Sequence, residues 1–404
     1  MPSQPGQRLL LFATIAAYCL IGVEIIIMIS PFALYFYSVY GPILDFFSSQ
    51  PALNWSTEFF LPHMVFLDDP LILGISYLQV LLVVGLLLFL AAAVPLYYGR
   101  FTGKGVVQAS FYGKTRHPQY LFLAISGFGL LLYWPRFIIL FMYITMLFVY
   151  YLLARNEEWR MRREAPEAYE KYMQTTPMFL PGEPGGKIYD AFFGRIRPKW
   201  CGILILYLVT LLVGLGMTMG IRGYTVRQLP LLTRANLTLL PVYPRPLAEV
   251  EAVYEKLVAT PAVRAELENN DVNLAYIFPA DYFLTAIVTD HERRFSDEVI
   301  QNFPEVLEWH QNKFSGGLGK FFRIFYNFVR NQGSKGTDYD VERAVLVQVR
   351  DAHDHRAPPR QLFGIGMRRT PLMIVDLDAT DHRILAISKS SGKHKWGTMP
   401  MPTF

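Results

Sequence analysis

The hydrophobic and polar positions divide the chain into two parts of different character. Up to residue 222, long runs of Leu, Ile, Val and Phe recur with few charges between them, whereas residues 223–404 carry charged side chains throughout. An apolar run of about 20 residues is long enough to cross a bilayer as a helix. The pattern therefore predicts an α-helical multi-pass membrane domain followed by a soluble domain.

Five apolar runs in the first part are candidate membrane spans. The third, Leu121–Tyr133, would be about 20 Å long as a helix, which is shorter than a ~30 Å hydrocarbon core. Because Pro135 and another long run follow it at once, the third and fourth runs predict a tight helical hairpin. The five runs are Leu9–Ser30, Leu71–Tyr98, Leu121–Tyr133, the run that ends at Ala154, and Cys201–Gly220.

The basic residues indicate how these helices are oriented. The loop after the second run and the segment after the fourth are rich in Lys and Arg, whereas residues 41–69 contain neither. Basic loops tend to stay on the cytoplasmic side of a membrane. We therefore expect the amino terminus and both basic segments in the cytoplasm. Five crossings then place residues 223–404 outside, provided that the short third run completes its crossing.

We expect residues 1–200 to form a membrane core, residues 201–222 the last transmembrane helix, and residues 223–404 an extracytoplasmic domain whose role the sequence does not indicate. In the last part, helical spacing over Leu247–Leu257 and strand-like runs separated by turns favour an α+β fold. The aromatic and basic stretch Lys320–Arg330 predicts a helix, either in the core or on the membrane surface. The predicted strands are Val272–Phe278, Ala344–Val349, Leu372–Val375 and Ile384–Ser388, the last two forming a hairpin.

Composition supports a membrane protein. It argues against a nucleic-acid-binding protein and against a protein held together by disulfides or by thiolate-bound metals. Of the 404 residues, 52% are hydrophobic, and the mean hydropathy is +0.25, whereas soluble domains rarely average above zero. The net charge of +5 is not gathered into a basic stripe, so we expect no nucleic-acid partner. The two cysteines, Cys19 and Cys201, both lie in apolar runs, so we expect neither a disulfide framework nor a thiolate metal site.

The candidate chemistry lies in the two basic segments. The first contains Arg116-His117-Pro118, preceded by an aromatic residue and followed by Tyr120, and it leads into the short third run. After the hairpin, the fourth run ends at Glu157-Glu158, and a Tyr-x-x-Tyr sequence and a proline-bounded hydrophobic tail follow. The compound pattern is much more specific than Arg-His-Pro alone.

This pattern resembles the membrane methyltransferases of the isoprenylcysteine carboxyl methyltransferase and phospholipid N-methyltransferase superfamily. The resemblance covers residues 70–185, and it departs from the family at Ser110, where Gly is common, and at Ala165-Pro166, where Phe-Gly is common. The second departure puts the shape of the closing segment in doubt. The matching residues are Tyr112, Arg116, His117, Pro118, Tyr120, Glu157, Glu158, Tyr169, Tyr172, Pro177 and Pro181.

The resemblance implies that the chain binds S-adenosylmethionine without a metal. Arg116 and His117 are suited to the carboxylate of this cofactor. Carboxylates such as Glu157 and Glu158 accept hydrogen bonds from the ribose hydroxyls or the ammonium, and tyrosine faces suit adenine or the sulfonium. The implied cofactor-binding residues are Tyr112, Arg116, His117, Pro118, Tyr120, Glu157 and Glu158.

Several of these residues also have a structural explanation. Arg116 and His117 could anchor a helix at the level of the lipid phosphates. Glu158 could pair with Arg162 one helical turn later. The pair Tyr169 and Tyr172 could serve only for packing or as interface anchors.

Glu24 lies within the first apolar run, where a carboxylate is costly. We expect it either to act in catalysis, by binding a cationic acceptor or taking its proton, or to be buried against a polar neighbour, or to lie near the outer surface of the membrane. The leading hypothesis is an integral membrane methyltransferase acting on a lipophilic or membrane-presented acceptor. We expect a bacterial inner membrane, or alternatively the endoplasmic reticulum, with the site on the cytoplasmic side. The acceptor and the oligomeric state are not indicated.

Two other functions remain open. One is an NADPH-dependent membrane reductase of the sterol-reductase type, although those enzymes carry Arg-His-x-Asn-Tyr where this chain has Pro118-Gln119-Tyr120. The other is a non-catalytic membrane anchor that presents the outer domain.

Overall fold

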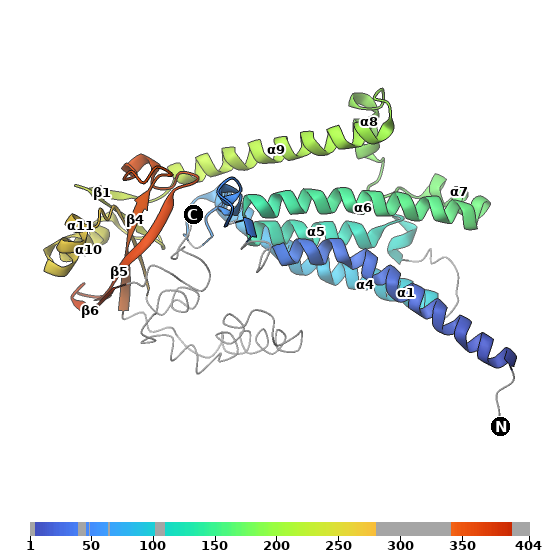
Figure 1. Cartoon of the computed structure of the whole chain (residues 1–404), viewed down its shortest axis with the longest axis horizontal. Coiled ribbons are helices and arrows are strands. Elements are labelled where there is room, and N and C mark those ends of the chain that lie inside the picture. The colour runs from blue at the N-terminus through green and yellow to red at the C-terminus, as the bar shows by residue number, and fades with distance from the viewer. Residues whose placement is uncertain are drawn as a thin grey trace. The chain divides into compact units, whose positions relative to one another are not determined.

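The computed structural model describes residues 5–38, 46–47, 49–63, 65–101, 110–279 and 341–389. The chain forms two compact units, one of Met1–Phe46 with Gly74–Gly220 and one of Phe47–Leu73 with Ile221–Phe404. The first is helical, and the second contains a mixed β-sheet (Figure 1). This confirms a helical part followed by an α+β part. The predicted helix Lys320–Arg330 lies outside the described residues.

The helical part follows the predicted apolar runs. In the described part of the chain, three helices are long and apolar enough to cross a membrane, Pro70–Gly99, Phe137–Glu164 and Lys199–Arg227, and two shorter apolar helices cover Ile21–Phe36 and Pro118–Tyr133. The helices are α1 (Pro5–Ser38), α3 (Pro70–Tyr77), α4 (Leu81–Phe101), α5 (Pro118–Tyr133), α6 (Phe137–Glu164), α7 (Pro166–Thr175), α8 (Pro184–Phe192) and α9 (Lys199–Arg227).

Helix α1 is longer than the first apolar run, because it continues through Pro31 to Ser38. A proline inside a helix removes a backbone hydrogen bond and usually bends or ends the helix. Here the residues beyond Pro31 are held by tertiary contacts: the side chain of Tyr35 is fully buried, and its hydroxyl donates to the carbonyl of Gly127 at 2.7 Å. Packing against α5 therefore outweighs the cost of the proline.

The predicted hairpin of the third and fourth runs is confirmed as α5 and α6, joined at residues 134–136. Helix α5 also crosses α4 at very short range. A Cβ atom at Gly129 would collide with the backbone of Leu82, and one at Gly85 would collide with the backbone of Ser126. Small residues allow such close approach of apolar helices. Figure 1 shows α1, α4, α5 and α6 running alongside one another.

The second unit is built on a sheet of six described strands in the order β1-β2-β3-β4-β5-β6. Strands β2 and β3 are parallel, connected through α10 (Leu247–Ala259) and α11 (Pro261–Asn269), and the other neighbours are antiparallel. The predicted β5–β6 hairpin is confirmed, whereas β1 and β2 were not predicted. The strands are β1 (Leu232–Arg234), β2 (Leu237–Pro241), β3 (Leu274–Pro279), β4 (Val341–Arg350), β5 (Arg368–Asp378) and β6 (Ile384–Lys389).

One face of this sheet forms a hydrophobic core with α10 and α11. Val250, Val253 and Leu257 of α10 are fully buried against strand residues such as Ile277 and Leu346. The three helix residues are spaced by three and four, which places them on one face of α10. Burial of such side chains contributes about 1.5–3 kcal/mol each, so this stripe explains why α10 packs on the sheet.

Residues 47–73 belong to the second unit, which the sequence did not lead us to expect. Arg222 donates to Glu58 Oε2 at 3.0 Å and to the carbonyl of Phe59; the side chain of Arg222 is buried, and that of Glu58 is 13% exposed. The backbone N–H of Phe66 donates to the carbonyl of Val242 at 2.7 Å. These contacts join the segment between α1 and α4 to the last turns of α9 and to the chain that follows it.

Candidate functional site

The α5–α6 hairpin brings the two halves of the motif together. His117 immediately precedes α5, and Pro118 occupies the first helical position, where its missing N–H costs nothing. Glu157 and Glu158 lie near the end of α6. Because the two helices are antiparallel, the beginning of α5 and the end of α6 are at the same end of the hairpin. The resulting group of Arg116, His117, Tyr120, Glu157 and Glu158 is called the motif cluster below.

His117 lies between the two carboxylates of the motif. Its Nδ1 is 3.4 Å from Glu157 Oε2, and its Nε2 is 3.5 Å from Glu158 Oε1. Consecutive helical residues point about 100° apart, and the imidazole ring meets both because it presents a nitrogen on each side. Both nitrogens are buried, and neither makes a hydrogen bond of good geometry in the described structure.

The charges around His117 favour its protonated form. Burial alone disfavours the imidazolium, but the neighbouring carboxylates of Glu157 and Glu158 outweigh burial and raise the pKa of His117 above its usual value. In this form both ring nitrogens carry a proton, and each faces one of the two carboxylates. The motif cluster is then close to neutral, since the charges of Arg116 and His117 balance the two carboxylates.

The guanidinium of Arg116 is engaged by the protein itself. Its Nε donates to Glu158 Oε1 at 2.7 Å, and its Nη1 donates to the carbonyls of Met173, at 3.2 Å, and Thr176. Its Nη2 lies 3.4 Å from Glu183 Oε1. The guanidinium is also buried. In this conformation it binds Glu158 and the chain after α7, so its N–H groups are not arranged for a bidentate contact with a ligand carboxylate.

These contacts bear on two expectations for the charged residues. The suggested pair of Glu158 with Arg162 is wrong, since Glu158 pairs with Arg116, while Arg162 Nε approaches Met173 Sδ at 3.2 Å. Arg116 is part of the motif cluster, and in this conformation its guanidinium positions Glu158 and the chain after α7; its predicted role in binding a cofactor stays a prediction.

Tyr120 contributes both a hydroxyl and an aromatic face. Its hydroxyl donates to Glu157 Oε1 at 2.5 Å. Its ring stacks on Tyr150, with centroids 4.9 Å apart, and more distantly on His117, at 5.8 Å. Tyr150 lies two helical turns before Glu157 on α6, so helical periodicity could have indicated it, although it is not part of the motif. The stacked rings of Tyr120, Tyr150 and His117 thus lie together, next to the carboxylate of Glu157.

Tyr112 makes hydrogen bonds that hold the start of α5 in place. Its hydroxyl donates to Gln119 Oε1 at 3.1 Å, and its backbone carbonyl accepts from the hydroxyl of Tyr172 at 2.6 Å. Tyr172 is buried, as is its neighbour Tyr169 on α7. Both tyrosines therefore pack α7 against the helical unit, which agrees with the packing alternative for them. Their burial does not test a role in binding a ligand.

The segment after α7 closes over the motif. The backbone N–H groups of Arg116 and His117 donate to the carbonyls of Pro177 and Met178, at 3.0 and 3.2 Å. The ring of Phe179 lies 5.9 Å from that of His117. Residues 176–183, called the closing segment below, thus cover the motif cluster. The departure at Ala165-Pro166 is accommodated, because α6 ends at Glu164 and α7 begins at Pro166.

Glu24 lies near the motif cluster and is paired. Its Oε1 is 2.9 Å from Arg160 Nη1, and both side chains are partly exposed. Arg160 follows Glu157 by one helical turn on α6, so the pair is at the same end of the helices as the motif. This is the polar-neighbour alternative for Glu24, and it also leaves the carboxylate close to the predicted cofactor residues.

The accessible group of the motif cluster is Glu157. Its side chain is 33% exposed, whereas those of His117 and Glu158 are 4% and 7% exposed. A carboxylate beside aromatic rings suits the hydroxyls, ammonium and sulfonium of S-adenosylmethionine. The residues present therefore fit this cofactor at its cationic and ribose groups.

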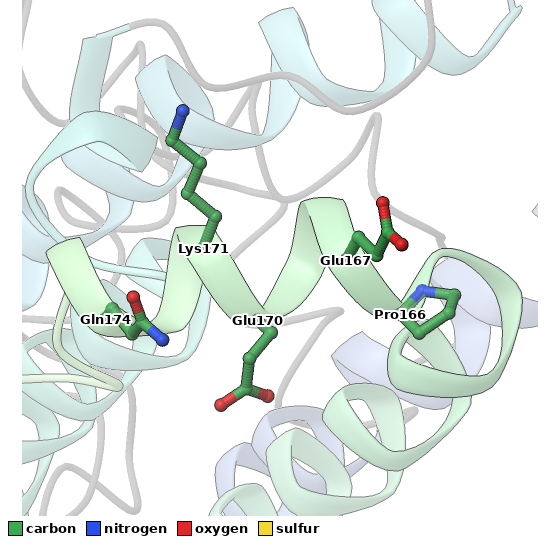
Figure 2. A pocket seen from close by; sticks show the side chains of 5 residues that line it. All are labelled: Pro166, Glu167, Glu170, Lys171 and Gln174. Atoms are coloured by element: carbon green, nitrogen blue, oxygen red, sulfur yellow. The ribbon is translucent and has the colours of Figure 1, made fainter.

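A surface hollow of about 500 Å³ lies along the outer side of α7. Figure 2 shows its lining side chains, with Lys171 and Glu170 pointing to opposite sides of the helix. It is separate from the motif cluster, whose hydrogen bond to α7 runs from Arg116 to the carbonyl of Met173. The lining residues are Pro166, Glu167, Glu170, Lys171 and Gln174.

Within the described ranges, no group of three or more His, Cys, Asp or Glu residues is placed to hold a metal ion. No protein-family model, no curated protein and no solved structure matches this chain. The family resemblance therefore depends on the motif residues and on the way the hairpin assembles them.

Proposed function

We propose that this chain is an integral membrane methyltransferase that uses S-adenosylmethionine and acts on a lipophilic or membrane-presented acceptor. The observation that carries the proposal is the position of His117 between Glu157 and Glu158. These residues come from the two ends of a helical hairpin, and they are the residues on which the family resemblance rests. A match to the family pattern that arose by chance would not require these residues to meet in one cluster.

Each residue has a distinct part in this proposal. Glu157 accepts hydrogen bonds from the ribose diol or the ammonium of the cofactor, and Tyr120 orients its carboxylate. His117 donates to the cofactor or to the two glutamates, and the ring of Tyr120 offers a face to adenine or the sulfonium. Arg116 fixes Glu158 and the closing segment, which excludes water.

The cofactor supplies a methyl group already activated by the positive sulfur. The protein then needs mainly to align donor and acceptor and to keep water out. No metal has a part in this scheme. The acceptor arrives from the bilayer, because the motif cluster lies at one end of a bundle of apolar helices. Prenylated or thiol compounds, carboxylates and lipid amines are the acceptor classes that fit, and Glu24 is the candidate group for binding or deprotonating one of them.

The contacts of residues 47–73 support five membrane crossings. This segment and the chain after residue 221 belong to one compact unit, so they lie on the same side of a membrane and an even number of crossings connects them. Helices α3–α4, α6 and α9 alone would give an odd number. The need for an even number supports a crossing by the short helix α5 as well. With α1 added, the total is five crossings.

We further propose that the motif cluster is cytoplasmic and that residues 223–404 are extracytoplasmic. The basic loops support this orientation. A bacterial inner membrane is the leading location, with the endoplasmic reticulum as the alternative.

Titration of the full-length protein in lipid nanodiscs tests the cofactor. We expect saturable binding of S-adenosylhomocysteine, lost in Glu157→Gln and retained in Glu167→Gln, which removes an exposed carboxylate on α7 outside the motif cluster. Binding of NADPH without S-adenosylhomocysteine would instead establish the reductase alternative. Binding of neither would favour a membrane anchor that presents the second unit.

A further inference from the structure

Helix α8, between the closing segment and α9, exposes a pair of large apolar side chains. Ile188 is 54% exposed and Phe192 is 78% exposed. They are four residues apart, so they lie on the same face of the helix. Trp200, at the start of α9, is exposed as well, at 64%. Large apolar groups gathered in this way indicate a surface that meets something other than water.

The exposure of this face does not result from a loosely attached helix. Tyr189 of α8 and Phe193, the residue that follows the helix, stack with their ring centroids 6.1 Å apart. The hydroxyl of Tyr189 donates to the carbonyl of Lys199 at 3.2 Å. A Cβ atom at Gly202 would press against the same hydroxyl. Helix α8 is therefore fixed against the first turn of α9, and Ile188 and Phe192 remain outside that contact.

The charges around α8 indicate what the apolar face meets. Lys187, Arg195, Arg197 and Lys199 are exposed, and the acidic residue among them is Asp190. Helix α9, a candidate membrane span, begins at Lys199, so α8 lies within a few residues of a bilayer surface. Apolar and aromatic side chains flanked by cations are the composition of helices that lie in the plane of a membrane interface.

We propose that α8 lies in the headgroup layer of a membrane containing anionic phospholipids. Ile188 and Phe192 insert among the upper parts of the acyl chains, and the four cations reach the headgroup phosphates by extending their flexible side chains. This inference rests on α9 crossing the membrane, not on methyl transfer.

The proposal gives α8 a role in holding the candidate site at the bilayer. Glu183, at the end of the closing segment, immediately precedes α8, and its carboxylate accepts from the N–H of Met178 at 2.8 Å and lies 3.4 Å from Arg116 Nη2. Insertion of α8 therefore keeps the closing segment at the membrane surface, where an acceptor dissolved in the bilayer would arrive.

Spin-label accessibility in nanodiscs tests the proposal. A nitroxide is attached at Phe192→Cys or at Asp190→Cys in full-length protein that also carries Cys19→Ser and Cys201→Ser. Position 190 is about 160° around the helix from position 192, so it serves as the matched control. Nanodiscs of phosphatidylcholine are compared with nanodiscs that also contain phosphatidylglycerol, and collisions with oxygen, which enters the bilayer, are compared with those of a water-soluble nickel complex.

We expect the label at position 192 to collide more with oxygen than with nickel, and the label at position 190 to show the reverse. Phosphatidylglycerol should increase this contrast, and a variant with Lys187→Gln, Arg195→Gln and Arg197→Gln should abolish the increase. Free access of nickel to position 192 would overturn the proposal. Shielding of that position from both probes would also overturn it, because a second copy or another protein would then cover the face. Neither result depends on cofactor binding.

Discussion

Nε of Arg116 and Oε1 of Glu158 lie 2.7 Å apart in a buried ion pair, although 42 residues separate them in the chain. The same arginine binds backbone carbonyls at the end of α7. One guanidinium therefore connects the start of α5, the end of α6 and the closing segment. This makes the pair a structural requirement of the candidate site as well as part of its motif.

We expect Glu158→Ala to destabilise the helical unit by about 3–5 kcal/mol, because it leaves the buried charge of Arg116 without its carboxylate. Thermal unfolding in detergent measures this as a lower Tm. Replacing both charges with apolar residues, in Arg116→Met with Glu158→Leu, should recover much of the loss, since no unpaired charge remains. A loss below about 1 kcal/mol, as for an exposed pair, would contradict the buried geometry.

The stability of the helical unit should fall as the pH rises through the neutral range. The carboxylates of Glu157 and Glu158 outweigh burial and raise the pKa of His117, whereas an unfolded histidine keeps a pKa of about 6.5. A raised pKa in the folded state gives a stabilisation that is complete below the unfolded pKa and is lost as the pH passes the folded pKa.

Melting curves between about pH 6 and about pH 9 measure this effect, a range that spans the ordinary histidine pKa. The Tm of His117→Gln should depend less on pH than that of the wild type. His353→Gln, which removes an exposed histidine of the second unit, should keep the wild-type dependence. Parallel curves for the wild type and His117→Gln would show that His117 does not titrate as expected.

The pair Glu24–Arg160 should matter for activity more than for stability. Because both side chains are partly exposed, losing the pair should cost at most about 1 kcal/mol. We expect Glu24→Gln to keep the Tm and the affinity for S-adenosylhomocysteine but to lower methyl transfer. Arg160→Gln is the control, because it breaks the ion pair but keeps the Glu24 carboxylate. It therefore distinguishes the effect of losing the pair from the effect of losing the carboxylate. Unchanged transfer in Glu24→Gln would remove Glu24 from the acceptor site.

Glu58 should be essential to the second unit. It accepts from Arg222 at 3.0 Å and from the N–H of Gly366 at 2.6 Å, and it lies 3.9 Å from Arg369. Glu58→Ala leaves two buried cations without this carboxylate, so we expect a loss of about 3–5 kcal/mol and faster proteolysis within residues 221–279. The exposed Glu249→Ala should change neither. Wild-type resistance in Glu58→Ala would show that residues 47–73 are not needed to hold this unit together.

The sequence was sufficient to predict the motif cluster because its residues lie at the two ends of one helical hairpin. A hairpin is local in sequence, and its antiparallel helices return to the same level. The contacts of Arg116 could not be predicted in this way. Its acceptors at Met173 and Thr176 depend on how α7 packs, which spacing does not encode.

Several features of the second unit could not be predicted from the sequence either. Strand β1 has three residues, and a strand this short has too little periodicity to recognise. The run Leu237–Pro241 is short and mostly apolar, with Thr238 as its polar residue, which is consistent with a buried strand but equally with part of a helix. The inclusion of residues 47–73 follows from contacts with Arg222 and Val242, far away in the chain, and such pairing is set by tertiary structure.

Methyl transfer measures the central claim most directly. Full-length protein in nanodiscs is incubated with methyl-labelled S-adenosylmethionine and a membrane extract, and label is counted in the extracted lipids and in the membrane proteins. We expect transfer by the wild type and by Glu167→Gln, and a loss of about 100-fold in Glu157→Gln, because misplacing a cofactor costs about that much. Equal transfer by the wild type and Glu157→Gln, with equal melting temperatures, would contradict the assignment.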